Sequence, residues 1–313
     1  MKSANHFLEH LQDSAEELED RLLLEAIESV AITSDLLQNN ELLIKIVNDY
    51  AILEKKYFEL NRNLIEKQEK IKEDLEAASA IQRALLPVNI PQLEHFDFVW
   101  NYIPCEEMGG DLVNIIPHNS DNWIFYIIDV TGHGPKAAMV TVALSQFLNS
   151  SNTQTSVDFL DPKAVFAALE INFPFTRFES LYTIIYGVIN LHSGEVKFCN
   201  SAHPKPVLIS DNHSEFLERH DPMLGLGICP DFTETKIVLT KGQKLVLCTD
   251  GLTECTNKNG EQFGEEKLLD FLKENHRLSC SELSEALQKS MEEFAVSLPL
   301  QDDFTCLMIE GKL

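Results

Sequence analysis

The first 86 residues contain neither glycine nor proline, and the first proline of the chain is Pro87. Because these two residues interrupt regular backbone structure most strongly, a segment of this length without them is predicted to be almost entirely helical. Between Leu53 and Leu85, apolar residues recur mainly at spacings of three and four, which is the period of an amphipathic helix. After Pro87 the pattern becomes mixed, so a different kind of domain is expected there.

The chain is therefore predicted to have three parts. Residues 1–50 form a helical input or dimerisation region rich in leucine, isoleucine and valine, with Thr33-Ser34-Asp35 offering a helix N-cap. Residues 51–87 form a linker helix whose polar faces carry mixed charges, as the outer faces of a coiled coil do. Its apolar stripe allows two interpretations: pairing with a second copy into a homodimer, which we favour, or folding back on residues 5–47. Residues 88–313 form the third part.

Short strands and helices alternate in residues 88–313. From Phe96 to Tyr102 aromatic residues occupy every second position, which is the period of a strand. Further strands are predicted at 123–130, 181–191, 195–200, 206–210, 235–239, 244–249 and 304–310. Helices are predicted at 135–149, 162–172, 265–275 and 281–295. Because several strands follow one another without a helix between them, antiparallel sheets covered by helices are expected, which is the α+β class.

Charge and composition exclude several classes of partner. The chain has 50 acidic residues against 25 Lys and Arg, so its formal charge is −25. An acidic surface repels phosphate backbones and anionic lipid, so neither nucleic acid nor a bare membrane is expected to bind. No apolar stretch approaches the roughly 20 residues of a membrane span, and the N-terminal residues lack the apolar core of a signal peptide. The seven scattered cysteines are typical of reduced, buried thiols, so a cytoplasmic protein is expected.

Acidic residues lie at predicted strand ends, beside glycine or a second acid. They are Asp111, Asp129, Asp250 and the pair Asp302-Asp303. Strand ends next to flexible turns can present side chains to a shared cleft, and carboxylate oxygens are the ligands that Mg²⁺ and Mn²⁺ prefer. Two such ions about 3.5–4 Å apart support in-line hydrolysis of a phosphate ester without a protein nucleophile. Each motif alone is weak, because Asp-Gly is a common turn, and together their composition indicates only an acidic metal cleft.

Eight motifs follow one another along the chain, and their order carries more information than any one of them. They are Ala78-x-x-Ile81-Gln82-x-x-Leu85-Leu86-Pro87, Gly109-Gly110-Asp111, Asp129-Val130-Thr131-Gly132-His133-Gly134-x-x-Ala137-Ala138, Asn200-x-x-His203-x-x-Pro206, Pro222-x-Leu224-Gly225, Thr249-Asp250-Gly251-Leu252-Thr253-Glu254, Phe263-Gly264 and Asp302-Asp303-x-Thr305. This series resembles the SpoIIE/RsbU-like branch of the PPM metal-dependent serine/threonine protein phosphatases. The resemblance covers residues 78–313.

The resemblance implies an α-β-β-α sandwich with two Mn²⁺ or Mg²⁺ ions in a cleft at one end. By motif position, Asp111 and Asp129 carry the metal pair, with Asp129 bridging and the main-chain carbonyl of Val130 as a further ligand. Asp250 and Asp302 complete the shell of one metal. These four aspartates are the expected catalytic residues.

Further residues are expected to support this centre. Asp303 is the second choice to Asp302 as a ligand. Gly110 and Gly132 would let the backbone approach the ions closely, because they have no Cβ. Two roles for His133 stay open: it acts near the leaving oxygen, or it shapes the turn.

The sequence departs from the family pattern at two positions. The family commonly carries a second aspartate three residues after the GGD aspartate, where this chain has Asn114. Loss of that acid is expected to weaken a contact to metal-bound water or the affinity for the second ion. The family's usual glycine before the motif histidine is replaced by Ala202, a milder change to a structural turn. Neither change removes an expected metal ligand, so activity is expected.

The leading hypothesis is a metal-dependent phosphoserine/phosphothreonine protein phosphatase in bacterial signalling. Its relatives act on phosphorylated anti-sigma-factor antagonists, and an N-terminal helical region receives a signal or an upstream regulatory protein. A second hypothesis is a catalytically weak or inactive phosphoprotein-binding regulatory module, which only Asn114 supports. A third is hydrolysis of a small phosphoester or nucleotide, although no base-binding or phosphate-loop motif is present.

Overall fold

The computed structural model describes residues 21–22, 36–88, 90–91, 93–149, 157–211, 213–218, 220–296, 298 and 300–312. The chain divides into two compact units, with the boundary between Lys72 and Glu73. The predicted N-cap at residues 33–35, and most of the predicted input region, lie outside the described residues. The predicted domain boundaries after residues 50 and 87 stay predictions.

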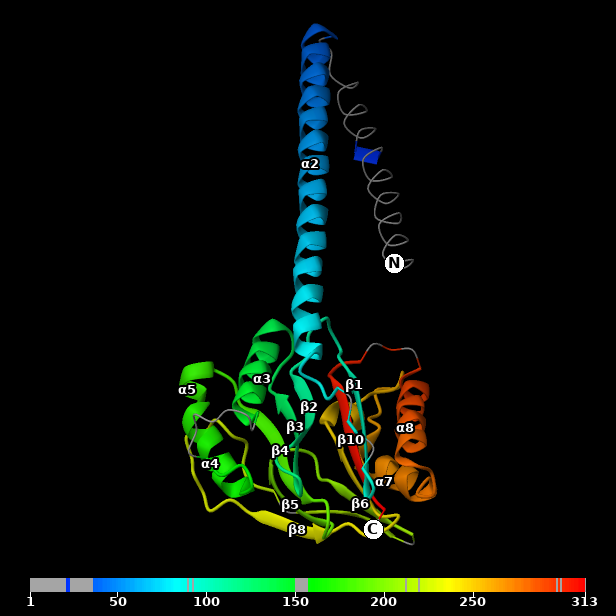
Figure 1. Ribbon diagram of the computed structural model, residues 1–313. Helices are drawn as coiled ribbons and strands as arrows, with labels where there is room; N and C mark the ends of the chain where they lie inside the picture. The colour runs from blue at the N-terminus through cyan, green and yellow to red at the C-terminus, as the bar shows by residue number, and fades with distance from the viewer. Residues whose placement is uncertain are drawn as a thin grey trace. The chain divides into compact units, whose positions relative to one another are not determined.

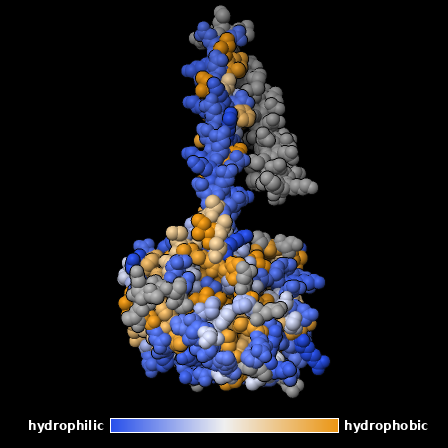
Figure 2. All heavy atoms as spheres, in the orientation of Figure 1, coloured by the Kyte–Doolittle hydropathy of each residue, from blue (hydrophilic) through white to orange (hydrophobic). Residues whose placement is uncertain are grey.

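Helix α2 (Leu36–Arg83) is unbroken over 48 residues, which confirms the helix predicted from the missing glycine and proline. It ends in a turn in which the amide groups of Leu85 and Leu86 donate to carbonyls of the last helical turn, just before Pro87. Hydrophilic side chains cover most of α2 on the face that Figure 2 shows. Large apolar side chains are nevertheless exposed at the predicted seam, among them Leu53, Tyr57, Leu60, Leu64 and Ile71. No described helix is long and apolar enough to cross a membrane.

The second unit contains two five-stranded sheets, and every strand pairs antiparallel to its neighbours. One sheet has the order β1-β10-β9-β6-β7 and the other β2-β3-β4-β5-β8. The strands are β1 (Phe96–Ile103), β2 (Asp111–Pro117), β3 (Asn122–Val130), β4 (Tyr182–Asn190), β5 (Glu195–Ser201), β6 (Val207–Ser210), β7 (His213–Phe216), β8 (Glu234–Val238), β9 (Lys244–Cys248) and β10 (Phe304–Gly311).

Helices cover the outer faces of both sheets. Figure 1 shows α3, α4 and α5 on the side of the β2–β5 sheet, and α7 and α8 on the side of β1 and β10. Their bounds are α3 (Pro135–Leu148), α4 (Pro162–Asn172), α5 (Phe175–Phe178), α6 (Asp250–Thr253), α7 (Gly264–Glu274) and α8 (Cys280–Ala295). The expected α+β class and α-β-β-α sandwich are therefore confirmed.

Strand β10 shows how the layers are held together. Side chains alternate between the two faces of a strand. Leu307 and Ile309 join the large apolar cluster that lies between the sheets and under α3 and α4. Cys306 and Met308 join a second cluster under α7 and α8. Thr305, two residues before Leu307, faces the other sheet, and this places its hydroxyl at the end of the sandwich.

Two strands and two short helices escaped the sequence-based prediction. Strand β2 has a nearly continuous buried run rather than an alternation, because the other sheet covers one face and α3 the other. Strand β7 is only four residues long and lies at a sheet edge. Helices α5 and α6 are each a single turn of four residues. Such short elements leave too few residues to show a period.

Gly187 in β4 lies directly opposite Phe125 in β3, and a Cβ at this position would overlap the Phe125 ring. Gly187→Ala is therefore expected to lower the free energy of unfolding by about 1–3 kcal/mol through overpacking, measured by urea denaturation. In a Phe125→Leu background the same substitution should cost less, because the smaller side chain leaves room. An equal cost in both backgrounds would contradict this account.

Candidate active site

Asp111 and Asp129 face each other across the two strands that end at the edge of the sandwich. They are direct register partners, Asp111 at the start of β2 and Asp129 near the end of β3. The Asp111 carboxylate is buried, and its Oδ2 accepts a hydrogen bond from Thr305 Oγ1 at 2.6 Å. Because Thr305 belongs to β10, this bond joins the two sheets at the site.

The other sheet contributes Asp250 and Asp302. Asp250 follows β9 after one intervening residue and begins α6, while Asp302 lies just before β10. Burial, and then the charges of Asp302 and Glu254, raise the pKa of Asp250 to about 6. Burial, and then the charges of Asp250 and Asp302, raise the pKa of Asp129 to about 8. The structure thus brings the aspartates of both sheets close enough to repel one another.

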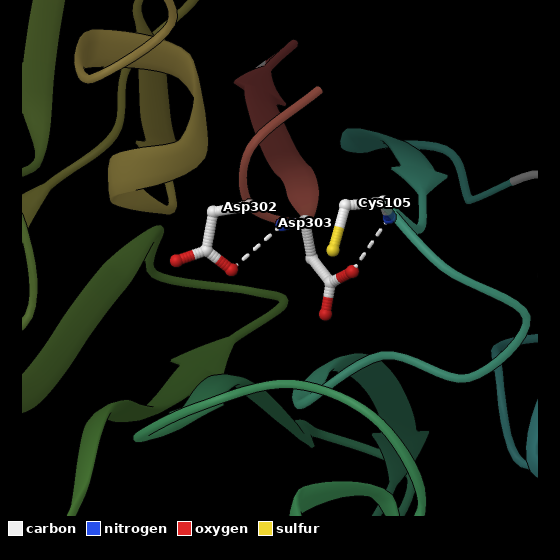
Figure 3. A group of neighbouring side chains, drawn as sticks. All are labelled: Cys105, Asp302 and Asp303. Atoms are coloured by element: carbon white, nitrogen blue, oxygen red, sulfur yellow. Dashed lines mark hydrogen bonds between the residues drawn. The ribbon is translucent and has the colours of Figure 1, made fainter. Parts of the chain in front are cut away.

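The Asp303 side chain is held by hydrogen bonds from backbone amide groups. Its side chain is buried and accepts hydrogen bonds from the amide groups of Cys105, at 2.8 Å, and Asp111, at 3.3 Å. Asp302 is more open, and its Oδ1 accepts the amide hydrogen of Asp303 at 2.8 Å. Figure 3 shows the two carboxylates on opposite sides of the strand end. Asp303 fixes the backbone around Asp111, whereas Asp302 accepts the amide hydrogen of Asp303 through only one of its two oxygens.

Glycines give this edge its close backbone approaches. A Cβ on Gly110 would lie 2.7 Å from the carbonyl oxygen of Val130 and 2.9 Å from that of Gly132. A Cβ on Gly251 would overlap the carbonyl of Asp303. Gly132 has φ +88°, a conformation that favours glycine. The carbonyl of Val130 therefore lies beside the GGD turn, in a space that only a glycine leaves free.

His133 lies at the exposed rim of this site. Its Nδ1 is 3.1 Å from Glu106 Oε1, and both side chains are about half exposed. The hydrogen bond and charge of Glu106 raise the pKa of His133. The imidazole therefore keeps its proton to a higher pH than a free histidine would.

Asn114 does not lie among the carboxylates. Its Nδ2 donates to the carbonyl of Leu85 at 3.1 Å and to the Tyr126 hydroxyl at 3.2 Å, and its Oδ1 accepts from the Ile115 amide. An aspartate could not make the two donor contacts. Ala202, at the other departure from the family pattern, has φ +50°, which explains why glycine is usual there.

Three residues that the sequence analysis left without a role belong to this site. Thr305 orients Asp111, and Thr249 Oγ1 donates to the carbonyl of Asp303 at 3.2 Å. Cys105 lies beside the aspartate pair, where burial and then the charge of Asp303 raise the pKa of its thiol to about 12. The two threonines could have been found from their places in the TDG and DDxT motifs. Nothing in the sequence pattern singles out Cys105.

The residues at this site fit a divalent cation. Several carboxylates share a buried space, where burial and then one another's charge raise their pKa values, and a backbone carbonyl opens onto the same turn. Hard cations such as Mg²⁺ and Mn²⁺ prefer oxygen ligands of this kind. A cation would replace the mutual repulsion by attraction, so the donor set suits one or more such ions.

The raised pKa values predict how stability depends on pH when divalent ions are removed. The folded pKa of Asp129 lies near 8 instead of 3.8. The folded chain then binds more protons than the unfolded chain, so stability should fall as pH rises from about 5 to about 8. In EDTA the melting temperature should drop by several degrees, since each kcal/mol corresponds to roughly 2–4 °C in a domain of this size.

The melting temperature is measured by scanning calorimetry, and two variants are compared with the unsubstituted chain. Asp129→Asn should flatten the pH dependence, and Mn²⁺ or Mg²⁺ added at the higher pH should restore the melting temperature of the unsubstituted chain. Asp231→Asn, at a side chain that is 97% exposed, should change neither result. A melting temperature that rises with pH in EDTA would show that the carboxylates do not repel one another as described.

Comparisons with known proteins agree with the geometry. The family model described as "Stage II sporulation protein E (SpoIIE)" matches residues 119–312. "Phosphoserine phosphatase RsbU" of Bacillus subtilis (strain 168) is 25% identical over 291 residues, covering 90% of this chain and 82% of the relative.

Two solved structures have the same fold. The "SiaA-PP2C domain of Pseudomonas aeruginosa" superposes with a TM-score of 0.67 at 22% identity, covering 78% of this chain and 98% of that one. A structure of RsbX in complex with magnesium superposes with a TM-score of 0.54 at 16% identity, covering 71% of this chain and 98% of that one. At these identities, the two structures support the fold alone.

Proposed function

The chain belongs to the stage II sporulation protein E (SpoIIE) family and is a serine/threonine phosphatase, and from that premise we propose that it is a metal-dependent signalling phosphatase that acts on a phosphorylated protein. One observation carries the proposal: aspartates from two sheets lie together at one edge, where bound cations would offset the repulsion between their negative charges. Both the family and the site then point to hydrolysis of a phosphate ester.

We propose that the centre holds two Mn²⁺ or Mg²⁺ ions. Asp111 and Asp129 would carry the pair, with Asp129 bridging and the Val130 carbonyl as a further ligand, and Asp250 and Asp302 would complete the set. When bound, the ions supply Lewis-acid stabilisation of phosphate charge and activation of water. The magnesium in the RsbX structure supports an ion of this class.

The remaining side chains position this set. The Thr305 hydroxyl fixes one oxygen of Asp111. Asp303 holds the amide groups of Cys105 and Asp111, so the GGD turn keeps its place against β10. His133 lies at the rim, where the hydrogen bond and charge of Glu106 raise its pKa, and we assign it the role near the leaving oxygen.

The substrate that we propose is a phosphorylated anti-sigma-factor antagonist, dephosphorylated in the cytoplasm. The RsbU relative, named a phosphoserine phosphatase, supports the phosphoprotein class. The net charge of −25 favours a partner with neutral or basic contacts around its phosphorylated residue.

The alternative of an inactive phosphoprotein-binding module is weaker. It was suggested by Asn114, where the family commonly has an acid. Asn114 contacts Leu85 and Tyr126, not the aspartates of the site. Its neutral side chain therefore leaves the set of proposed metal ligands unchanged.

Regulation through the linker helix has a physical route within the second unit. Gln82, near the end of α2, is 2% exposed, and its Nε2 donates to the carbonyl of Gly109 at 2.7 Å. Asn114 of β2 holds the carbonyl of Leu85. The end of α2 is thus bonded to the GGD turn and to the strand that follows it. We propose that α2 pairs in a homodimer and that an upstream regulatory protein changes this pairing, which moves the GGD turn.

The activity is tested by measuring phosphate release from a phosphoserine peptide with Mn²⁺, Mg²⁺ or EDTA. Asp250→Asn should lower kcat by about 100-fold or more, the typical cost of losing one electrostatic stabiliser at an active site. Asp231→Asn, at an exposed ion pair, is the matched control and should keep full turnover. Turnover that persists in EDTA would contradict the metal-dependent proposal, and a preference for phosphorylated metabolites would contradict the protein substrate.

The linker contact is tested by Gln82→Ala, with Gln68→Ala on an exposed part of the same helix as control. Loss of the amide leaves a buried carbonyl without its donor, so the free energy of unfolding should fall by about 1–3 kcal/mol. If Gln82 positions the GGD turn, Mn²⁺ affinity measured by calorimetry should also weaken by about 10- to 100-fold, as for other supports of metal ligands. A loss of stability with unchanged Mn²⁺ affinity and turnover would refute the route through Gln82.

A further inference from the structure

Cys105 lies on the segment between β1 and β2, next to the aspartate pair that precedes β10. Its thiol Sγ and one carboxylate oxygen each of Asp302 and Asp303 all lie within 4.8 Å of one another. Figure 3 shows the Asp303 side chain between those of Asp302 and Cys105, with the Cys105 sulfur beside it. Among the residues that the structure describes, this is a group of three side chains placed to share one ion.

A backbone hydrogen bond holds Cys105 in position. Its amide donates to Asp303 Oδ1, which ties the segment to the strand end regardless of what the side chain does. The side chain is partly exposed, whereas five of the other cysteines are buried. The thiol is therefore within reach of an ion from solvent.

Sulfur changes which cations such a group prefers. Carboxylates and carbonyls favour Mg²⁺ and Mn²⁺, whereas a thiolate favours softer ions such as Zn²⁺ and its analogue Cd²⁺. Zinc binds cysteine sulfur at about 2.3 Å and carboxylate oxygen at about 2.0–2.2 Å. A centre made only of aspartates would lack this preference.

We propose that Cys105, Asp302 and Asp303 form a binding site for a thiophilic divalent cation of the zinc class. Binding forms a bond from sulfur to the ion and releases the thiol proton to solvent, with no change in oxidation state. The site shares Asp302 with the proposed phosphatase centre, so a bound zinc-class ion takes a ligand from that centre and inhibits turnover. The binding stands on the geometry alone, whereas the inhibition rests on the proposed function.

The binding is tested by titrating the full chain with Cd²⁺ and recording the ultraviolet sulfur-to-cadmium charge-transfer absorption. The unsubstituted chain should show this absorption at one equivalent, and Cys105→Ser should abolish it. Asp302→Asn should keep the absorption but weaken Cd²⁺ binding by about tenfold or more, since even outer supports of a metal cost that much. Cys229→Ser, at an exposed cysteine outside the group, should behave like the unsubstituted chain.

The same titration can overturn the proposal. Absorption that persists in Cys105→Ser would assign the sulfur to other cysteines, such as Cys248 and Cys306, whose Sγ atoms lie 3.2 Å apart in the core. A melting curve of each variant shows whether it is folded, and Cys105→Ala provides a second substitution that also keeps the amide bond to Asp303. Unchanged absorption in both folded variants would rule out the site.

Turnover separates this inference from the phosphatase proposal. With Mn²⁺ present, Zn²⁺ should inhibit the unsubstituted chain at concentrations about tenfold or more below those needed for Cys105→Ser. Equal inhibition of both would refute the shared ligand, even where Cd²⁺ binds. A chain with no turnover in any metal would refute the phosphatase proposal, and the Cd²⁺ absorption would still decide the binding site.

Discussion

Repulsion between carboxylates at the edge of the sandwich is the constraint that the rest of the second unit must meet. Asp111 and Asp129 are fixed opposite each other by the register of β2 and β3. Burial of apolar side chains in the core offsets the unfavourable free energy of this repulsion, because β3 is buried along almost its whole length. Polar contacts then direct each carboxylate, as Thr305 does for Asp111. A stable scaffold thus keeps a site that would be unfavourable by itself.

The same edge of the second unit also contacts the end of α2. The end of α2 contacts the GGD turn through Gln82, and Asn114 contacts the turn that follows α2. Each contact joins a side-chain amide to a backbone carbonyl, so each depends on position more than on charge. The segment that leads into the domain is therefore bonded to the part of the domain that carries the chemistry.

The sequence predicted those parts of the structure that leave a local signal, either a period or a continuous apolar run. Strands such as β3 and β10, and helices such as α3 and α8, were recognised close to their true bounds. Strand β2 was missed because Asn114 interrupts its apolar run and both of its faces are covered, so its residues show neither signal. The register that pairs Asp111 with Asp129 is a long-range property, and local pattern contains nothing that specifies it.

The candidate site shows the same division. The aspartates and glycines were found from ordered motifs, since each motif keeps its own residues adjacent. The contacts of Asn114 and Cys105 were not predicted, because they are made with residues far away in the sequence. Asn114 contacts a helix end 29 residues earlier. The Cys105 amide contacts an aspartate 198 residues later. Contacts of that span come only from the fold.

The continuity of α2 across the boundary between the two units has a consequence for the evolution of such chains. Each residue added to an α-helix turns everything beyond it by about 100° and advances it by about 1.5 Å. An insertion of one residue upstream of Gln82 would therefore rotate the apolar stripe away from its former direction, whereas seven residues would nearly restore it. Under the proposed pairing of α2, the segment before this helix is therefore expected to be exchangeable only in length steps that keep the apolar stripe in the same direction.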